Sequence, residues 1–157
     1  MNETMQVARF VAAARYEDLP MGLIERAKEY VLDNMASGFV GVVQPWSKMV
    51  AALAGDLGGR AEATVFRQAA KADISTASLV NGAMIGAFEV EHVGHSAHPG
   101  GTVFPVAPAF AERERLGGQS FILALMLGYE ATCRVGAAQT RAAEDIITWM
   151  LPSEIQQ

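Results

Sequence analysis

Apolar residues recur at helical spacing along most of the chain, with charged and polar residues between them. The clearest example is residues 20–40, where Arg26, Lys28 and Glu29 lie on the side opposite an apolar stripe. The members of the stripe are Leu23, Ile24, Ala27, Val31, Leu32, Met35 and Phe39. This pattern predicts an amphipathic helix that buries the stripe, with Pro20 in its first turn.

Similar periodicity predicts helices over residues 3–15, 46–57, 105–116 and 119–134. The cap-type residues Asp73, Ser75 and Thr76 predict a further helix that runs to about Glu91. Residues 63–66 could form a short strand or an extended connector. Loops marked by glycine and proline separate these segments. The pattern predicts an all-α helical bundle, not an alternating βαβ fold.

Composition limits the partners that the chain can have. The net charge of −5 provides no basic field, so we expect neither nucleic acid nor an anionic membrane as a partner. Charged residues make up only 18% of the 157 residues and apolar residues 51%, which excludes a disordered chain. This low proportion of charged residues also indicates that a partner covers part of the surface.

The cysteine content and the N-terminus indicate a cytoplasmic protein. Cys133 is the single cysteine, so it cannot form an internal disulfide or hold an iron–sulfur cluster by itself. The first residues contain an early acid and lack the apolar core of a signal peptide. Uncharged runs are too short to span a membrane.

The candidate chemistry is concentrated in one segment. Between Ile74 and Ala111 the only Asp, Glu, Lys or Arg residues are Glu89 and Glu91. All three histidines of the chain follow directly, as His92, His95 and His98. Titratable groups in apolar surroundings can be tuned for proton transfer near neutral pH, so this segment is the candidate acid/base site.

Plainer explanations exist for the same residues. A helix end rich in Glu and His can simply be solvated, and Gly100-Gly101 can serve a tight turn as readily as an anion. The His-x-x-His-x-x-His spacing offers three zinc-type ligands, but it matches neither a helical i, i+4 pair nor a common finger pattern. We therefore predict no metal site, and we interpret Cys133 as a core residue.

Several short motifs in order resemble the MmgE/PrpD family, which includes 2-methylcitrate dehydratase and cis-aconitate decarboxylase. They are Leu19-Pro20, Leu32-Asp33, the run from Gly58 to Val65, Val80-Asn81-Gly82, the acidic helix end, His98-Pro99-Gly100, Pro105, Ala111-Glu112, Gly128-Tyr129-Glu130 and Arg134. Each motif is modest, and the series together is specific.

The resemblance implies a fold and a site. It implies a helical domain that adjoins a lid domain in full-length enzymes, homodimers, and catalysis without a metal or other cofactor. The family's active-site histidine matches His98, and its acidic run falls on Glu89, Glu91 and His92. Substrate-binding roles would fall on His92, His95, Gly100 and Gly101. Both acids are Glu here, and His92 replaces the second member of an Asp pair.

The resemblance covers only the N-terminal portion of a family enzyme. It implies a partial helical domain at residues 1–140, followed by a divergent tail at 141–157, with the lid and the catalytic lysines absent. Positive charge for a trianionic substrate would then have to come from another segment, or from Lys71 or Arg134 if these fold close to the site.

The leading functional hypothesis is a lyase, of the 2-methylcitrate dehydratase type, that acts on a small polycarboxylate by acid/base proton transfer. His98, Glu89 and Glu91 would be its catalytic residues. One alternative is a non-catalytic helical subunit or truncated remnant that assembles with itself or with a complementary C-terminal subunit. Another is an epimerase, isomerase or decarboxylase of the same family.

Overall fold

The computed structural model describes residues 3–94 and 97–150, with side chains described as far as residue 139. The described residues are mostly helical and contain no strand, which confirms the predicted all-α class. In order, its main helices are α1 (Glu3–Ala13), α2 (Met21–Gly41), α3 (Pro45–Leu57), α4 (Ile74–Ile85), α5 (Pro99–Thr102), α6 (Val106–Glu114) and α7 (Gly118–Met150). Single 3-10 turns, η1 (Tyr16–Asp18) and η2 (Gly86–Phe88), precede α2 and follow α4.

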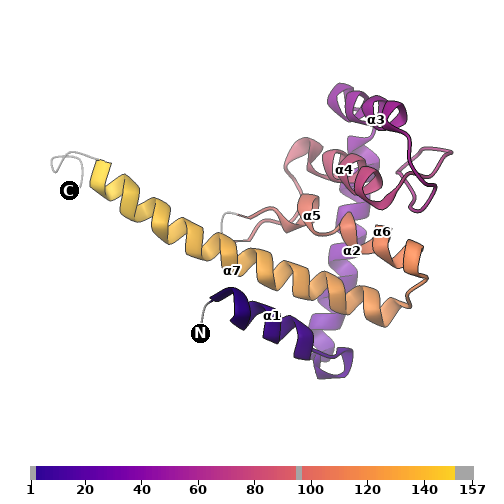
Figure 1. The fold of residues 1–157 in the computed structure, drawn as a ribbon. Helices are drawn as coiled ribbons and strands as arrows, with labels where there is room; N and C mark the ends of the chain where they lie inside the picture. Colours follow the sequence, from indigo (N-terminus) through magenta and orange to yellow (C-terminus); the bar gives the residue numbers. More distant parts are fainter. Residues whose placement is uncertain (1–2, 95–96, 151–157) are drawn as a thin grey trace.

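Helix α4 lies at the centre of the bundle, between α2, α3, α5 and α6 (Figure 1). It begins where the cap residues predict, because the Asp73 carboxylate accepts hydrogen bonds from the backbone N–H groups of Ser75 and Thr76. Val80, Met84 and Ile85 of this helix are buried, and two apolar clusters surround them. The central helix therefore carries the core, and the loop that follows it carries the candidate chemistry.

Helix α2 buries only the first part of the stripe that periodicity predicts. Ile24 and Ala27 of the stripe are buried, but Leu32 is 70% exposed and Phe39 46% exposed. In the second half of the helix the buried positions are instead Asn34, Ser37, Gly38 and Gly41. Small residues on the buried face allow a close approach to α4. A Cβ added at Gly41 would lie 1.8 Å from the Met84 carbonyl oxygen. The larger apolar residues of the second half of α2 consequently stay exposed.

Other predicted boundaries also differ from the structure. Helix α4 ends at Ile85 rather than near Glu91, because Glu89 adopts a left-handed conformation with φ of 53° that turns the chain. Helix α7 continues past Arg134 to Met150, through a sequence without proline. In place of a strand, Ala63 makes one isolated antiparallel bridge with Ala72.

Helix α7 is apolar, and part of it packs against the bundle. Its segment Gly118–Gln139 is long and apolar enough to cross a membrane by length and composition, with a mean hydropathy of 1.3. A core helix passes the same test, so this is weak evidence for a span. Ile122, Leu125 and Tyr129 of α7 are buried against the rest of the bundle.

A polar clamp ties α6 to the loop before α4. The Glu112 carboxylate accepts hydrogen bonds from the Thr64 backbone N–H at 3.2 Å, the Thr64 hydroxyl at 2.9 Å and Lys71 Nζ at 2.7 Å. Burial alone raises the pKa of Glu112, but the bonds from Lys71 and Thr64 outweigh burial and leave the pKa below its usual value.

We expect this clamp to be sensitive to acid. Because the folded-state pKa of Glu112 is lowered, its stabilising contribution is present above the unfolded-state pKa of about 4.5 and is lost as the pH falls further. Glu112→Gln should reduce the free energy of unfolding by about 1–2 kcal/mol at pH 7. Urea unfolding between pH 3 and pH 7 should show that difference shrink below pH 4.5. A difference independent of pH would contradict the ionic clamp.

Candidate acid/base site

The loop after α4 folds back, so that α5, which follows the loop, packs against α4. Glu89 starts the turn, Gly94 and Ala97 pair as an antiparallel bridge, and His98 is the N-cap residue of the single-turn helix α5. Pro99 occupies the first position of that turn, where its missing N–H costs nothing. This path brings residues 91 and 98 together.

Glu91 and His98 form the central pair of the site. Glu91 Oε1 lies 3.2 Å from His98 Nδ1, and the Glu91 side chain is only 3% exposed whereas that of His98 is 45% exposed. A buried carboxylate that accepts the Nδ1–H fixes the tautomer of the ring and leaves the Nε2 lone pair free. The half-exposed imidazole is therefore placed to exchange a proton with a bound molecule.

Glycines make room for the buried carboxylate. Cβ atoms added at Gly86 and Gly101 would lie 3.6 Å and 3.5 Å from Glu91 Oε1, which is ordinary contact. A Cβ at Gly100 would lie 2.8 Å from both Cβ and Cγ of Glu91. The Gly100-Gly101 pair, predicted to bind substrate, thus packs against Glu91.

Asn34 is a site residue that the sequence analysis missed. It is fully buried, and its Nδ2 donates to the Tyr30 carbonyl at 2.7 Å and to Tyr129 Oη at 2.9 Å. These bonds use both amide hydrogens, and Oδ1 is 2.5 Å from the Cβ position of Gly100. Among the described residues neither Asn34 Oδ1 nor Glu91 Oε2 has a hydrogen-bond partner, so two buried acceptors lie close to Gly100.

The available signal for Asn34 was its position within α2. The residue follows Ala27 and precedes Gly38 and Gly41 on the face that proves to be buried. A polar residue among small ones at helical spacing is typical of a closely packed face that holds a specific hydrogen bond. The larger apolar stripe on the other side obscured this pattern.

The Tyr129 hydroxyl should lose its proton only at high pH. Burial raises its pKa to about 12, although the bond from Asn34 acts in the opposite direction. Because the folded-state pKa lies above the usual value of 10, the associated stability is present below pH 10 and is lost as the pH rises towards 12. Ultraviolet titration of the phenolates should show a step near pH 12 that Tyr129→Phe removes. Retention of that step in the variant would contradict the assignment.

His92 lies in an aromatic and acidic environment. Its ring centroid is 4.0 Å from that of Tyr30, which in turn stacks on Tyr129 at 5.5 Å. His92 Nδ1 is 3.3 Å from Asp33 Oδ2, an ion-pair distance without the alignment of a hydrogen bond. The ring is thus placed to face Asp33 when it is protonated.

The remaining predicted site residues are placed as follows. Glu89 is exposed and makes no side-chain hydrogen bond to another described residue. His95 lies outside the described residues. Within the described part of the chain no group of three or more His, Cys, Asp or Glu side chains is arranged to hold a metal ion. The three-histidine alternative includes His95 and therefore stays a hypothesis.

The two cations that could have folded near the site are engaged elsewhere. Lys71 pairs with Glu112 at 2.7 Å, and Arg134 pairs with Glu130 one turn away on α7. Neither contacts Glu91 or His98 in the described structure. The site as described is therefore acidic, and a polycarboxylate would need positive charge from another source.

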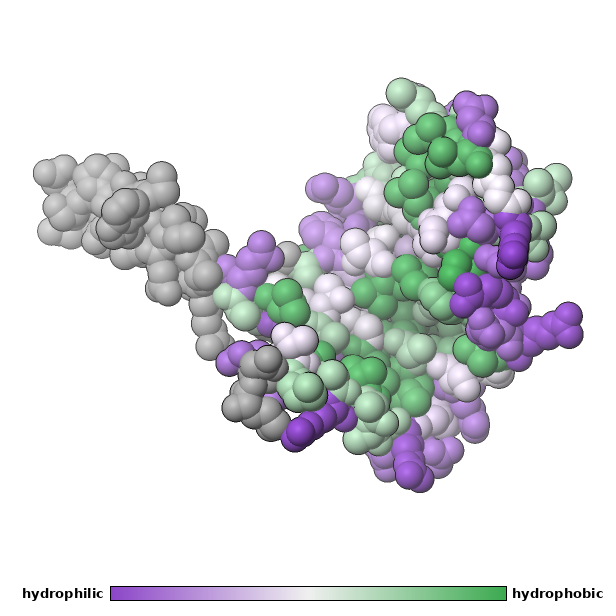
Figure 2. Space-filling view, viewed as in Figure 1, coloured by the Kyte–Doolittle hydropathy of each residue, from purple (hydrophilic) through white to green (hydrophobic). Residues whose placement is uncertain are grey.

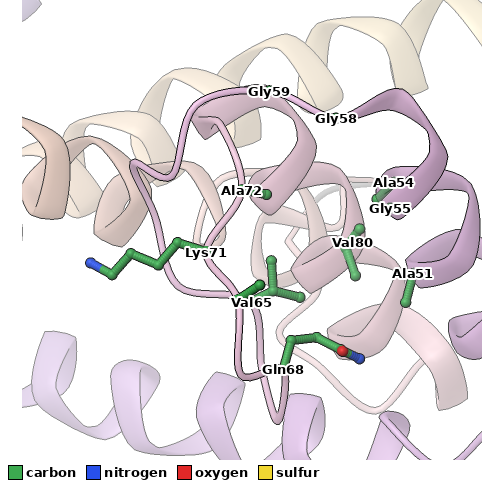
Figure 3. Close-up of a pocket in the computed structure, with 11 residues that line it drawn as sticks. Ala51, Ala54, Gly55, Gly58, Gly59, Val65, Gln68, Lys71, Ala72 and Val80 are labelled. Atoms are coloured by element: carbon green, nitrogen blue, oxygen red, sulfur yellow. The ribbon is translucent and has the colours of Figure 1, made fainter.

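A hollow of about 230 Å³ lies between α3 and the loop that precedes α4 (Figure 3). Small and apolar residues line it, and Val65 and Val80 point into it, whereas Lys71 points away. Neither Glu91 nor His98 is among its lining residues. The hollow offers shape without acid/base groups, so we do not assign the chemistry to it.

The fold and the pair together define a class: an all-α domain in which a buried carboxylate and a histidine lie side by side at a helix-loop-helix junction. The sequence profile of the MmgE/PrpD N-terminal domain matches residues 5–152. The chain therefore belongs to the MmgE/PrpD family.

Two curated relatives are similar to this chain. The cis-aconitate decarboxylase-like protein oryM of Aspergillus oryzae is 31% identical over 147 residues, which cover 87% of this chain and 30% of that protein. The cis-aconitate decarboxylase of Aspergillus terreus is 27% identical over 142 residues, which cover 86% of this chain and 29% of that protein. The chain thus spans about 30% of the length of these relatives.

Proposed function

We propose that this chain carries the acid/base half of a lyase that acts on a small polycarboxylate in the cytoplasm. The observation that supports the proposal is the buried Glu91 carboxylate 3.2 Å from the half-exposed His98 ring. Family membership and the names of the two relatives point to the same reaction class. His98 transfers the proton, and Glu91 is its partner.

The pair suits proton transfer at a carbon next to a carboxylate. In a dehydration, His98 Nε2 takes the proton from that carbon, the electron pair forms a carbon–carbon double bond, and the hydroxyl takes the proton back from the imidazolium and leaves as water. Glu91 stabilises the imidazolium that forms. In a decarboxylation, the His98 ring starts protonated: a carbon–carbon bond breaks, carbon dioxide leaves, and the electron pair left on the carbon takes the proton from the imidazolium. We propose the dehydration as the reaction. The decarboxylation is the alternative, because both relatives are named as cis-aconitate decarboxylases or similar proteins.

Substrate carboxylates need a cationic partner in either reaction. The buried charge of Glu91 repels a polycarboxylate, and Lys71 and Arg134 are paired with other acids. Positive charge would therefore come from a second polypeptide, either another copy of this chain or a complementary subunit. The complete active site is then an assembly.

The test is a turnover assay of the whole chain with 2-methylcitrate, citrate and cis-aconitate, in which mass spectrometry identifies the product. His98→Ala should lower turnover by about 100-fold or more. Glu25→Gln replaces an exposed carboxylate on α2 that pairs only with Lys28, and this matched control should keep full turnover. Where the parent chain shows measurable turnover, equal turnover of His98→Ala would disprove the role of His98.

A second candidate function is a helical subunit without chemistry of its own. Large exposed apolar side chains on α2, α3 and α7 support it, because such surface is usually covered by a partner. A folded chain that shows no turnover alone or with added partner, but that associates, would favour this candidate.

A further inference from the structure

Apolar side chains reach the surface of this fold in many places (Figure 2), whereas some polar atoms lie in its interior. Two of these atoms are acceptors beside the acid/base pair. Asn34 is fully buried, and the Glu91 side chain is 3% exposed. Within the described part of the chain, neither Asn34 Oδ1 nor Glu91 Oε2 meets a hydrogen-bond donor. Buried acceptors are almost always paired with protein or with ordered water, so these two oxygens require a donor.

Neither side chain can rotate to find that donor. The Asn34 amide is held in its orientation, because Nδ2 donates to the Tyr30 carbonyl at 2.7 Å and to Tyr129 Oη at 2.9 Å. A flipped amide would place Oδ1 against the Tyr30 carbonyl, which is itself an acceptor. Glu91 is held as well, since its Oε1 lies 3.2 Å from His98 Nδ1. Both unpaired oxygens therefore stay in the interior.

The start of α5 brings the two acceptors together and adds a donor. The Cβ position of Gly100 lies 2.5 Å from Asn34 Oδ1 and 2.8 Å from Glu91 Cγ, so both side chains approach the same point. The Cβ position of Gly101 lies 3.5 Å from Glu91 Oε1. The first N–H groups of a helix have no acceptor within it, and that of Gly101 has none among the described residues. Two acceptors and one donor are the usual partners of a buried water.

We propose that one buried water molecule bridges Asn34 and Glu91, and that Asn34 acts through this water as a positioning residue for the acid/base pair. The water donates one hydrogen to Asn34 Oδ1 and the other to Glu91 Oε2, and it accepts the Gly101 N–H. With Oε2 engaged, Oε1 stays with His98 Nδ1, so the ring keeps the Nδ1–H tautomer and the lone pair on Nε2. Tyr129 supports this arrangement because it holds the Asn34 amide.

The water can be detected in the parent chain without any substitution. In a crystal structure of the full chain, a water oxygen should lie within about 3.2 Å of both Asn34 Oδ1 and Glu91 Oε2. In solution, the Gly101 N–H should show a cross-peak to a long-lived water in a rotating-frame NOE spectrum. Density for a metal ion at that place, or for no atom between the two oxygens, would overturn the proposal.

Three substitutions test the positioning role. Asn34→Leu removes the amide at similar size, and it should shift the His98 ring nitrogens in long-range nitrogen–proton spectra as Glu91→Ala does. Tyr129→Phe removes one of the two bonds that hold the amide, so it should cause a smaller shift in the same direction. Ser47→Ala is the matched control, since it removes a buried hydroxyl on α3 that has no partner among the described residues. The His98 signals should stay unchanged in that variant.

Urea unfolding separates positioning from a purely structural role. If Asn34→Leu lowered the urea midpoint but kept the His98 signals of the parent chain, Asn34 would only support the fold, and the proposal would be wrong. Equal shifts of the His98 signals in Asn34→Leu and Ser47→Ala would overturn it too. If Asn34→Leu does not fold, Tyr129→Phe and the water of the parent chain decide.

The effect on turnover rests on the proposed function. The kcat of Asn34→Leu should fall about tenfold with KM unchanged, because Asn34 orients the acid/base pair and is buried away from any substrate. A parent chain without turnover would count against the proposed function, while the His98 spectra and the water would still test the role of Asn34. An active parent chain whose kcat and His98 signals survive Asn34→Leu would remove Asn34 alone.

Discussion

Replacement of Gly41 by alanine should remove much of the stability of the fold. The new Cβ would lie 1.8 Å from the carbonyl oxygen of Met84 and 2.8 Å from its carbonyl carbon. Both atoms belong to the backbone of α4, so no side-chain rotation can relieve the clash. Helices α2 and α4 would have to separate, and we expect a loss of about 3 kcal/mol or more in the free energy of unfolding.

Urea unfolding followed by circular dichroism measures this loss. Gly55→Ala on α3 is the matched control, since a Cβ there meets nothing within 4 Å. Alanine is the better helix former, so that variant should gain about 0.5–1 kcal/mol. Opposite signs for the same substitution would show that close packing of α2 against α4 decides the result. A Gly41→Ala chain that loses less than Gly55→Ala gains would contradict the described packing.

The contrast between these glycines shows what the sequence could and could not predict of the fold. Helix existence followed from periodicity and caps, as for Asp73 at the start of α4, because local hydrogen bonds determine it. The buried face of α2 followed only in the first half of the helix, at Ile24 and Ala27, because further on hydrophobicity favours Leu32 and Phe39, whereas packing distance favours Gly38 and Gly41. Close approach of two backbones is a tertiary property that no hydropathy pattern contains.

The candidate site was also only partly predictable, because some of its residues are close in sequence and others are brought together by packing. The concentration of Glu and His in an uncharged stretch indicated the segment, and the structure brings Glu91 and His98 together there. The different positions of Glu89 and Glu91 depend on a single left-handed residue, since the turn at Glu89 directs one side chain to solvent and the other inward. Asn34 comes from a different helix, so its proximity depends on the packed fold.

The second large effect is expected at Gly100, where the same kind of substitution should disable the chemistry. A Cβ there would lie 2.5 Å from Asn34 Oδ1 and 2.8 Å from both Cβ and Cγ of Glu91. Asn34 is held by Tyr30 and Tyr129, so Glu91 is the group that can yield. Its carboxylate would move away from His98, and a misplacement of about 1 Å costs on the order of 100-fold in rate.

Two measurements separate this displacement from general unfolding. Turnover of Gly100→Ala should fall by about 100-fold, while circular dichroism should keep its helical signature. Imidazole nitrogen shifts in long-range nitrogen–proton spectra should change for His98, because loss of the carboxylate releases the Nδ1–H tautomer. Glu91→Ala, which removes the acceptor, should produce the same spectral change without the steric cause.

Gly86→Ala provides the graded comparison. Its Cβ would lie 3.6 Å from Glu91 Oε1, an ordinary contact distance, so the carboxylate has no reason to move. The variant should therefore disturb the His98 signals far less than Gly100→Ala does. If Gly86→Ala and Gly100→Ala disturbed the His98 signals equally, the close contact at Gly100 would not be the cause of the change. If neither did, Glu91 would not be the group that orients the ring. The order of the two effects thus tests whether buried packing around one carboxylate determines the state of an exposed histidine.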